Sequence, residues 1–192
     1  MGTDSLTISP SDVTKTRDIA VDFSAIAKGF GVDELARLVE AAGGRNYLVE
    51  IGGELRANGF NQRGQTWLIG VETPDLIQRV PFTAIPLANL AMATSGDYRN
   101  YFEVEGERFS HTIDPSTGYP ITHNVASVTV LAATAAEADG YATAINVMGA
   151  EAGLDLAERI SLPVLVILKE SGGFTSRTSS AFDEYLVEQS TK

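Results

Sequence analysis

The sequence predicts an α+β fold in which helices pack on a largely antiparallel or mixed sheet. Many short apolar segments are separated by tight turns, which is typical of antiparallel strands joined by hairpins. Only a few segments carry apolar residues at helical spacing. The chain has 192 residues, of which 44% are hydrophobic and 20% charged, which is enough for a domain with its own core. We therefore expect residues 1–192 to form one domain.

Most predicted strands are short apolar runs that end at glycine, proline or asparagine. Residues 47–51 (YLVEI) are expected to form a buried strand, which two glycines interrupt before 54–57 continues it. The prolines within 81–90 restrict that segment to an edge strand or irregular structure. Further strands are expected at residues 5–8, 13–16, 19–23, 67–71, 98–104, 107–113, 126–132, 163–168 and 174–178.

Helices are expected where apolar residues recur every three or four positions. The clearest helix covers 25–42, where Ile26, Phe30 and Leu35 recur at helical spacing. Ser24 is the predicted N-cap of this helix, because a serine oxygen can accept from the first free N–H groups. Other helices are expected at residues 137–148, 152–160 and 181–187.

Charge and composition exclude several classes of function. Fourteen basic and 25 acidic residues give a net charge of −11, so the chain lacks the clustered positive charge of a nucleic-acid-binding surface. There is no cysteine, which excludes disulfides and thiolate metal sites. No run is long and apolar enough to span a bilayer, and the polar N-terminus lacks a signal-peptide core. A phosphate ligand would need local devices such as helix ends, a metal or a single lysine.

The stretch 21–33, VDFSAIAKGFGVD, has the composition of a phosphate-binding turn. Small residues such as Gly29 leave the backbone uncovered, so that a bulky anion can approach it. Lys28 is the only positive charge in the stretch and falls on the first turn of the predicted helix, whose free N–H groups attract anions. A strand-to-helix turn built from small packing residues would have the same pattern, so both interpretations stay open at this point.

A second pattern lies in 135–148, AAEADGYATAINVM. Asp139 and Thr143 are four positions apart and therefore share one face of a predicted helix. Carboxylate and hydroxyl oxygens are hard ligands that suit Mg²⁺. Taken separately, Asp139 would be a solvated surface charge and Thr143 a hydroxyl bonded to a helix carbonyl.

A third pattern is 110–120, SHTIDPSTGYP, in which His111 precedes a strong turn signal formed by Asp114, a proline and Gly118. His111 is either a packed strand residue or a general base, because imidazole exchanges protons near neutral pH. His123 follows in a loop, and we interpret it as structural or solvent-facing.

Two glutamates flank the glycine pair that interrupts the 47–57 hairpin. Glu50 precedes the pair and Glu54 follows it. One or both of them face a ligand, or they form a salt bridge with a basic residue at the strand break. The pattern allows both interpretations.

Five blocks occur in an order that resembles the ApbE family, the FAD:protein FMN transferases. The blocks are DFSAIAKGFGVD, YLVEIGGELRANG, ATSGDYRNYF, FSHTIDPSTGYPI and EADGYATAINVMG. Together they extend from about residue 19 to the end of the chain, and five blocks in register are far more specific than any single motif. Members of the family carry a further region upstream, with further FAD contacts, so the resemblance covers roughly their C-terminal two-thirds.

The resemblance implies an ApbE-type fold, binding of FAD and Mg²⁺, and transfer of FMN from FAD to a Thr or Ser hydroxyl of an acceptor protein with release of AMP. The acceptors that it implies are subunits of redox complexes at bacterial membranes. It also implies export to the periplasm or cell envelope, often as a lipoprotein. A second copy of this chain is a candidate cover for the flank of the sheet that the upstream region would occupy, so a homodimer is among the expected partners.

The same resemblance assigns residues to the metal. It implies that the side chains of Asp139 and Thr143 bind the ion and that the backbone carbonyl of Ala25 completes the set. Asp22 and Lys28 then match positions that contact the flavin nucleotide.

The resemblance places His111, Thr112 and Ile113 in the block that lines the nucleotide. A general base must take the proton of the acceptor hydroxyl. His111 is the first candidate for this base and Asp139 is the second.

Two other functions remain open on the same residues. Water in place of the acceptor hydroxyl would make the protein a Mg²⁺-dependent FAD diphosphatase that yields FMN and AMP. A protein that has lost catalysis would instead be a flavin-binding or assembly protein, which releases no AMP. Retention of Asp139, Thr143 and His111 favours an enzyme, and the short N-terminal region favours the non-catalytic alternative.

Overall fold

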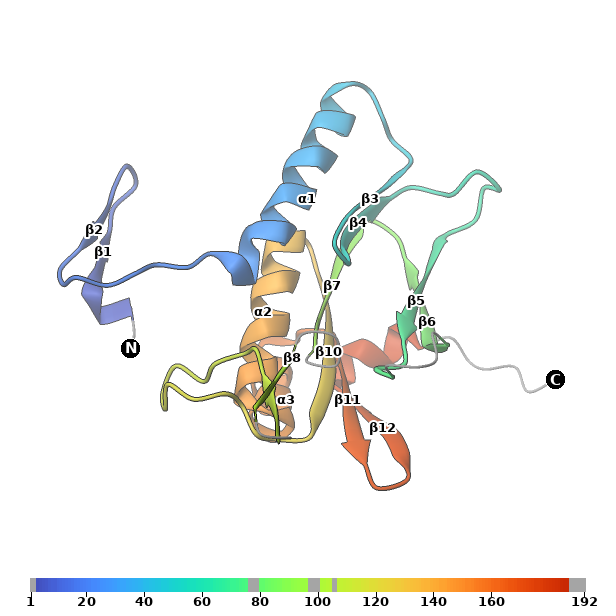
Figure 1. Ribbon diagram of the computed structural model, residues 1–192. Helices are drawn as coiled ribbons and strands as arrows, with labels where there is room; N and C mark the ends of the chain where they lie inside the picture. Colours follow the sequence, from blue (N-terminus) through green and yellow to red (C-terminus); the bar gives the residue numbers. More distant parts are fainter. Residues whose placement is uncertain (1–2, 76–79, 97–100, 105–106, 187–192) are drawn as a thin grey trace.

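A computed structural model describes residues 3–75, 80–96, 101–104 and 107–186 of the chain. Its centre is a six-stranded sheet with the order β12-β11-β10-β7-β4-β3, in which every neighbouring pair is antiparallel (Figure 1). The strands of this sheet are β3 (Tyr47–Ile51), β4 (Glu54–Asn58), β7 (Leu90–Gly96), β10 (Val125–Ala132), β11 (Val164–Glu170) and β12 (Gly173–Thr178). The predicted α+β class with a largely antiparallel sheet is confirmed.

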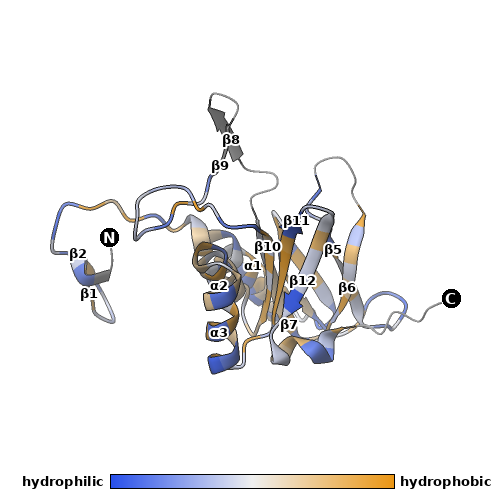
Figure 2. Cartoon of the chain, turned by 90° about the horizontal axis from the view of Figure 1, so that it is seen from below, coloured by the Kyte–Doolittle hydropathy of each residue, from blue (hydrophilic) through white to orange (hydrophobic). Residues whose placement is uncertain are grey.

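Three helices cover one face of this sheet, and a hairpin covers the other (Figure 2). The helices are α1 (Ser24–Ala41), α2 (Ala135–Met148) and α3 (Ala150–Ile160). The hairpin pairs β5 (Trp67–Glu72) with β6 (Pro81–Leu87), and the 3-10 helix η2 (Ser180–Tyr185) packs on the same side. None of the helices in the described part of the chain is long and apolar enough to cross a membrane.

The neighbouring strands β10 and β11 are buried on both faces, and the alternation of their side chains divides the core. Val128 and Val130 of β10 belong to the cluster beneath the helices, together with Val164 and Val166 of β11. Side chains on the opposite face pack against the hairpin and η2. These residues include Leu131, Leu165, Ile167 and Phe182. The period of two in these strands therefore builds one core on each side of the sheet.

Two further hairpins lie outside the main sheet. The 3-10 turn η1 (Thr3–Ser5) leads into β1 (Leu6–Ile8), which pairs with β2 (Val13–Lys15). Later in the chain, β8 (Tyr101–Val104) pairs with β9 (Glu107–Ser110). The segment predicted as an edge strand or irregular structure forms β6 in a two-stranded hairpin, which tolerates its two prolines.

Three sequence-based expectations need correction. Residues 19–23 form no strand. They are irregular backbone that leads directly into α1. The predicted strand 107–113 ends at Ser110, before the turn that follows. The expected C-terminal helix is the 3-10 helix η2, and the predicted strand start at residues 98–100 lies outside the described residues.

The helix α1 buries a face that differs from the expected one. Its buried residues are Gly29, Val32 and Ala36, whereas Ile26 is 41% exposed and Phe30 is 60% exposed. The face with the small residues is the buried one because α1 approaches α2 closely. A Cβ atom at position 29 would lie 2.2 Å from a backbone carbonyl oxygen of α2. The helical spacing predicted the helix correctly but not its buried side.

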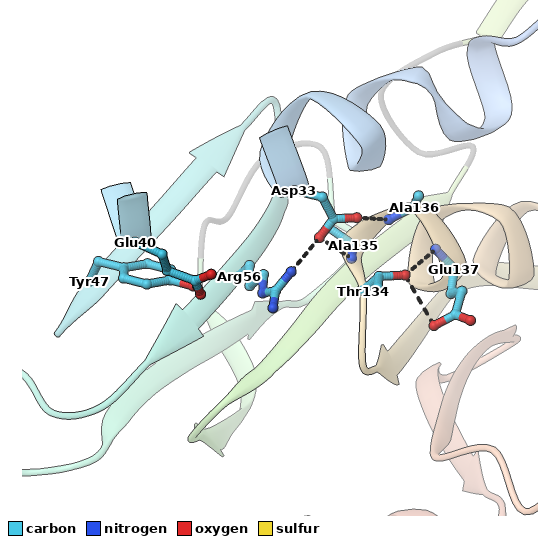
Figure 3. A network of polar contacts seen from close by, with 8 residues as sticks. All are labelled: Asp33, Glu40, Tyr47, Arg56, Thr134, Ala135, Ala136 and Glu137. Atoms are coloured by element: carbon cyan, nitrogen blue, oxygen red, sulfur yellow. Dashed lines mark hydrogen bonds and ion pairs between the residues drawn. The ribbon is translucent and has the colours of Figure 1, made fainter. Parts of the chain in front are cut away.

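One carboxylate, Asp33 of α1, ties the two helices to the sheet (Figure 3). It accepts hydrogen bonds from the backbone N–H groups of Ala135 and Ala136, each at 2.9 Å, and Arg56 of β4 donates to it at 3.1 Å. The N-cap Thr134 accepts from the N–H of Glu137 at 3.2 Å and donates to its carboxylate. The first turn of α2 is therefore capped from its own sequence and from α1.

At the far end of α1, the hydroxyl of Tyr47 donates a hydrogen bond to the carboxylate of Glu40 (Figure 3). Burial of the ring and this hydrogen bond raise the pKa of Tyr47 to about 12. The contact joins the last turns of α1 to β3, so the helix is held against the sheet at its middle and in its last turns.

Replacing Gly29 by alanine tests the close approach of the helices. Gly29→Ala should destabilise the protein by about 1–3 kcal/mol, because the new methyl group meets rigid backbone of α2. Gly31→Ala on the same helix is the matched control, since its methyl group would meet only the flexible end of Ile51, at 3.0 Å. Urea unfolding of both variants measures the difference, and equal stability of the two would contradict the packing described here.

Candidate functional site

The first turns of α1 meet α2 at a buried carboxylate. Asp139 is 4% exposed, and its Oδ2 accepts a hydrogen bond from the N–H of Gly29 at 3.0 Å. In an α-helix the same N–H is directed at the carbonyl four residues earlier, which belongs to Ala25. The Asp139 carboxylate therefore binds the backbone of α1 one helical turn after Ala25.

Thr143 lies one turn after Asp139 on α2 and is partly buried. The two side chains share a helix face, as predicted. A Cβ atom at Gly140 would lie 3.2 Å from Cγ2 of Ile26, so the start of α1 stays against this part of α2. The structure thus brings together the regions that carry Ala25, Asp139 and Thr143, although they come from distant parts of the sequence.

A partly buried ion pair lies beside this contact. Glu54 at the start of β4 is 1% exposed, and its Oε1 forms an ion pair with Nζ of Lys28, whose side chain is 45% exposed. The other oxygen, Oε2, is buried and has no hydrogen-bond partner among the described residues. Of the two glutamates at the glycine pair, Glu54 therefore faces the site, while Glu50 is exposed on β3.

The three charged groups act on one another. Burial raises the pKa of Asp139, and the Gly29 hydrogen bond and the charge of Lys28 partly oppose this rise. Burial likewise raises the pKa of Glu54, where contact with Lys28 opposes the rise and the charge of Asp139 adds to it. One lysine therefore offsets the charge of two buried carboxylates.

The donor set at the helix contact suits a hard cation. In the described part of the chain, no three histidine, cysteine, aspartate or glutamate side chains converge as a metal cluster. A cation would depend on one carboxylate together with hydroxyl, carbonyl and water oxygens. Mg²⁺ accepts such a set, because it usually keeps several waters and uses one or two carboxylates. Asp139, Thr143 and the Ala25 carbonyl provide the oxygen chemistry that this ion needs.

Asp22 has a structural partner in addition to the nucleotide contact predicted for it. Its Oδ1 accepts a hydrogen bond from the N–H of Ser24 at 2.6 Å, and hydrogen bonding from the side chain and then the backbone of Ser24 lowers the pKa of Asp22. The predicted N-cap Ser24 is wrong, because Ser24 is the first helical residue and Phe23 holds the cap position without a side-chain bond. Asp22 supplies the capping oxygen instead.

The block that carries His111 forms a loop after β9. His111 is exposed, and the N–H of Thr112 donates to the hydroxyl of Ser110 at 2.9 Å. Ile113 is 44% exposed and forms an isolated β-bridge with Pro120. All three predicted nucleotide-lining residues therefore sit at the start of one narrow loop.

The predicted turn at Asp114 is present in this loop. The Asp114 carboxylate accepts from the N–H and hydroxyl of Ser116 at 2.8 and 2.6 Å, which lowers the pKa of Asp114. The N–H of Gly118, at a φ of +76°, donates to the Asp114 carbonyl at 2.8 Å. The loop returns to the helices at exposed His123, whose ring lies against Gly149 between α2 and α3.

Sequence reasoning did not find Asp33, the residue that caps α2. The available signal was a carboxylate one turn after Gly29, on the side of α1 that carries the small residues. A separate hollow of about 360 Å³, between α2 and the ends of β10 and β11, contains none of the predicted site residues. The helix contact, with its buried charges, is therefore the candidate site.

Comparisons with known proteins agree with the block pattern. The model of the ApbE family matches residues 1–168. A Haemophilus influenzae protein named FAD:protein FMN transferase is 50% identical over 165 residues, covering 85% of this chain and 48% of that protein. The chain spans about half the length of the curated relatives that it matches.

Solved structures show the same fold. The flavin transferase ApbE from Vibrio cholerae aligns with a TM-score of 0.86 at 45% identity, covering 96% of this chain and 59% of that one. The apo form of the flavinyl transferase ApbE from Pseudomonas stutzeri aligns with a TM-score of 0.85 at 41% identity, covering 96% and 57%.

The role of Asp22 as a helix cap can be measured. Asp22→Ala should lower the free energy of unfolding, because the start of α1 loses its capping oxygen, whereas Asp22→Asn should retain most of the stability. Urea unfolding of the two variants beside the parent gives the comparison. Identical stability of Asp22→Ala and the parent would show that the carboxylate does not cap α1.

Proposed function

Because the chain belongs to the ApbE family, we propose that it acts in the transfer of FMN from FAD to a Thr or Ser hydroxyl of an acceptor protein. The hydroxyl oxygen attacks the phosphorus of the FMN half, the diphosphate bond breaks, and AMP leaves. The observation that supports this function most directly is the buried Asp139 at the first turns of α1, beside Lys28. The names of the matched relatives support the same reaction.

Asp139, Thr143 and the Ala25 carbonyl would hold Mg²⁺. When bound, the ion neutralises charge on the diphosphate. The N–H of Gly29 holds the Asp139 carboxylate against α1, one helical turn after Ala25.

Lys28 would attract the diphosphate from the first turn of α1. Its side chain is only half buried, so a ligand can reach it, and the positive end of the helix dipole adds to the potential there. These local devices act against the net charge of −11, which repels anions from the molecule as a whole. Asp22, Thr112 and Ile113 would complete the contacts to the nucleotide.

His111 would take the proton from the acceptor hydroxyl, with Asp139 as the second candidate for this base. His111 is exposed on a loop, where the side chain of an acceptor protein can approach it. Histidine is also the residue that exchanges protons most readily near neutral pH. Asp139, by contrast, is buried and held by a hydrogen bond, which suits a ligand better than a base.

The exposure of Lys28 and His111 favours hydrolysis of FAD as a second candidate function. Lys28 and His111 are open to water as well as to a protein hydroxyl. Water would turn the reaction into hydrolysis of FAD to FMN and AMP. For transfer, we expect the acceptor to be a subunit of a membrane redox complex and the chain to work at the cell envelope.

A single assay separates these functions. The protein is incubated with FAD, Mg²⁺ and an acceptor protein that carries a flavinylation threonine, and the mixture is run on a denaturing gel. A fluorescent acceptor band with release of AMP supports transfer. Free FMN and AMP without a fluorescent band support hydrolysis, and FAD binding without AMP supports a non-catalytic protein.

Asp139→Asn should abolish Mg²⁺-dependent turnover in this assay while the fold remains intact, because the amide loses the negative charge that a divalent ion requires. We expect a loss of at least about a hundredfold. Asp155→Asn, at an exposed position of α3, is the matched control and should keep full activity. Circular dichroism checks the fold, and full FMN transfer by Asp139→Asn would end the assignment of Asp139 to the metal.

His111→Asn should slow transfer by roughly two to four orders of magnitude, because the amide cannot accept the proton. The loss should be smallest at high pH, where hydroxide replaces the base. His123→Asn is the control, since the ring of His123 lies at the end of the same loop against Gly149, and the proposed reaction gives it no role. An unchanged rate for His111→Asn would transfer the role of base to another group.

A further inference from the structure

We propose that Glu54 is a positioning residue that holds Lys28 away from Asp139, which keeps the Asp139 carboxylate available to a divalent cation. This inference rests on the proposed function, in which Asp139 binds the ion and Lys28 faces the diphosphate. The role is indirect: Glu54 acts through Lys28 and has no contact with the reacting atoms.

The burial of Glu54 is costly and needs a reason. Its side chain is 1% exposed, next to the apolar core residues Leu55 and Ala57 of the same strand. A buried carboxylate with one unpartnered oxygen destabilises a fold, and an apolar residue of similar size would pack at least as well. Since Oε2 has no partner among the described residues, Glu54 contributes less to stability than a fully bonded ion pair would. The contact with Lys28 is therefore the feature that explains why a carboxylate is buried at position 54.

Lys28 acts on two carboxylates. Its ammonium contacts Glu54, while its charge also acts on Asp139. The neighbouring residue, Gly29, donates its N–H to Asp139, so the backbone of α1 already touches the second carboxylate. The lysine stem is flexible and can carry its charge to either partner.

The turn between β3 and β4 guides the lysine toward Glu54. A Cβ atom at Gly52 would lie 3.5 Å from Cδ of Lys28 and 3.8 Å from Oε2 of Glu54. The stem of the lysine therefore runs over the glycine turn, on the sheet side of α1. Without the charge of Glu54, this direction loses its attraction and Asp139 remains as the described carboxylate on which Lys28 acts.

An ammonium at Asp139 would compete with a dication for the same oxygens. Carboxylate oxygens that accept hydrogen bonds from lysine are poorer ligands, and the extra positive charge repels the metal. Glu54 thus decides which carboxylate the lysine neutralises. In this arrangement, a glutamate on the sheet controls metal binding on a helix that it does not belong to.

A double-mutant cycle on Mg²⁺ binding, measured by calorimetry on the full chain without FAD, tests this role. Glu54→Gln should weaken Mg²⁺ binding about ten- to hundredfold. In the Lys28→Met background the same substitution should have little effect, because the competing ammonium is gone. Glu50→Gln, an equal charge change at an exposed position of the same hairpin, is the matched control and should leave binding unchanged.

Several results would overturn the inference. Unchanged Mg²⁺ affinity in Glu54→Gln would do so, and so would an equal loss in the Lys28→Met background, since Glu54 would then act by its own charge. If Glu54→Gln does not fold, Lys28→Met decides: it should bind Mg²⁺ at least as tightly as the parent, and weaker binding counts against the role. Asp139→Asn separates the two proposals, because normal Mg²⁺ binding in that variant would refute the metal site itself, whereas lost binding there with normal binding in Glu54→Gln refutes only the role of Glu54.

Discussion

The absence of a side chain at Gly29 sets the distance between α1 and α2, and the candidate site depends on that distance. Because only hydrogen occupies this position, the backbone of α1 comes against the Ala135 carbonyl, and its N–H reaches the buried Asp139. One turn later, Asp33 binds the two N–H groups that open α2 and also receives Arg56 from the sheet. Close packing and capping thus fix one helix relative to the other over two successive turns.

The charges around this contact follow from the same packing. Two carboxylates are buried where the helices and β4 meet, and burial raises the pKa of both. A single half-exposed lysine offsets them in a molecule whose net charge is −11. Local arrangement of a few charges, more than the overall field, therefore determines what can bind here.

Patterns that repeat along the chain made the fold and part of the site predictable. The alternation in β10 and β11 and the helical spacing of α1 and α2 are local, and the shared face of Asp139 and Thr143 follows from helix geometry alone. The buried face of α1 was not predictable in this way: Ile26 and Phe30 are the more apolar residues, yet the small Gly29 decides the packing because its partner is backbone more than a hundred positions away. Which of Glu50 and Glu54 faces the site was not predictable either, because it depends on which side of the β3–β4 hairpin α1 covers.

The two helices that form the site meet only through long-range contacts. Gly29 and Asp139 are separated by 110 positions, and Asp33 and Ala135 by 102. Closing a chain segment of this length carries an entropic cost that the assembled core offsets, so the contact depends on the folded structure as a whole. A ligand that bridges the helices therefore binds the native state and not a partly folded one, and each increment of its binding free energy adds to the stability of the whole structure.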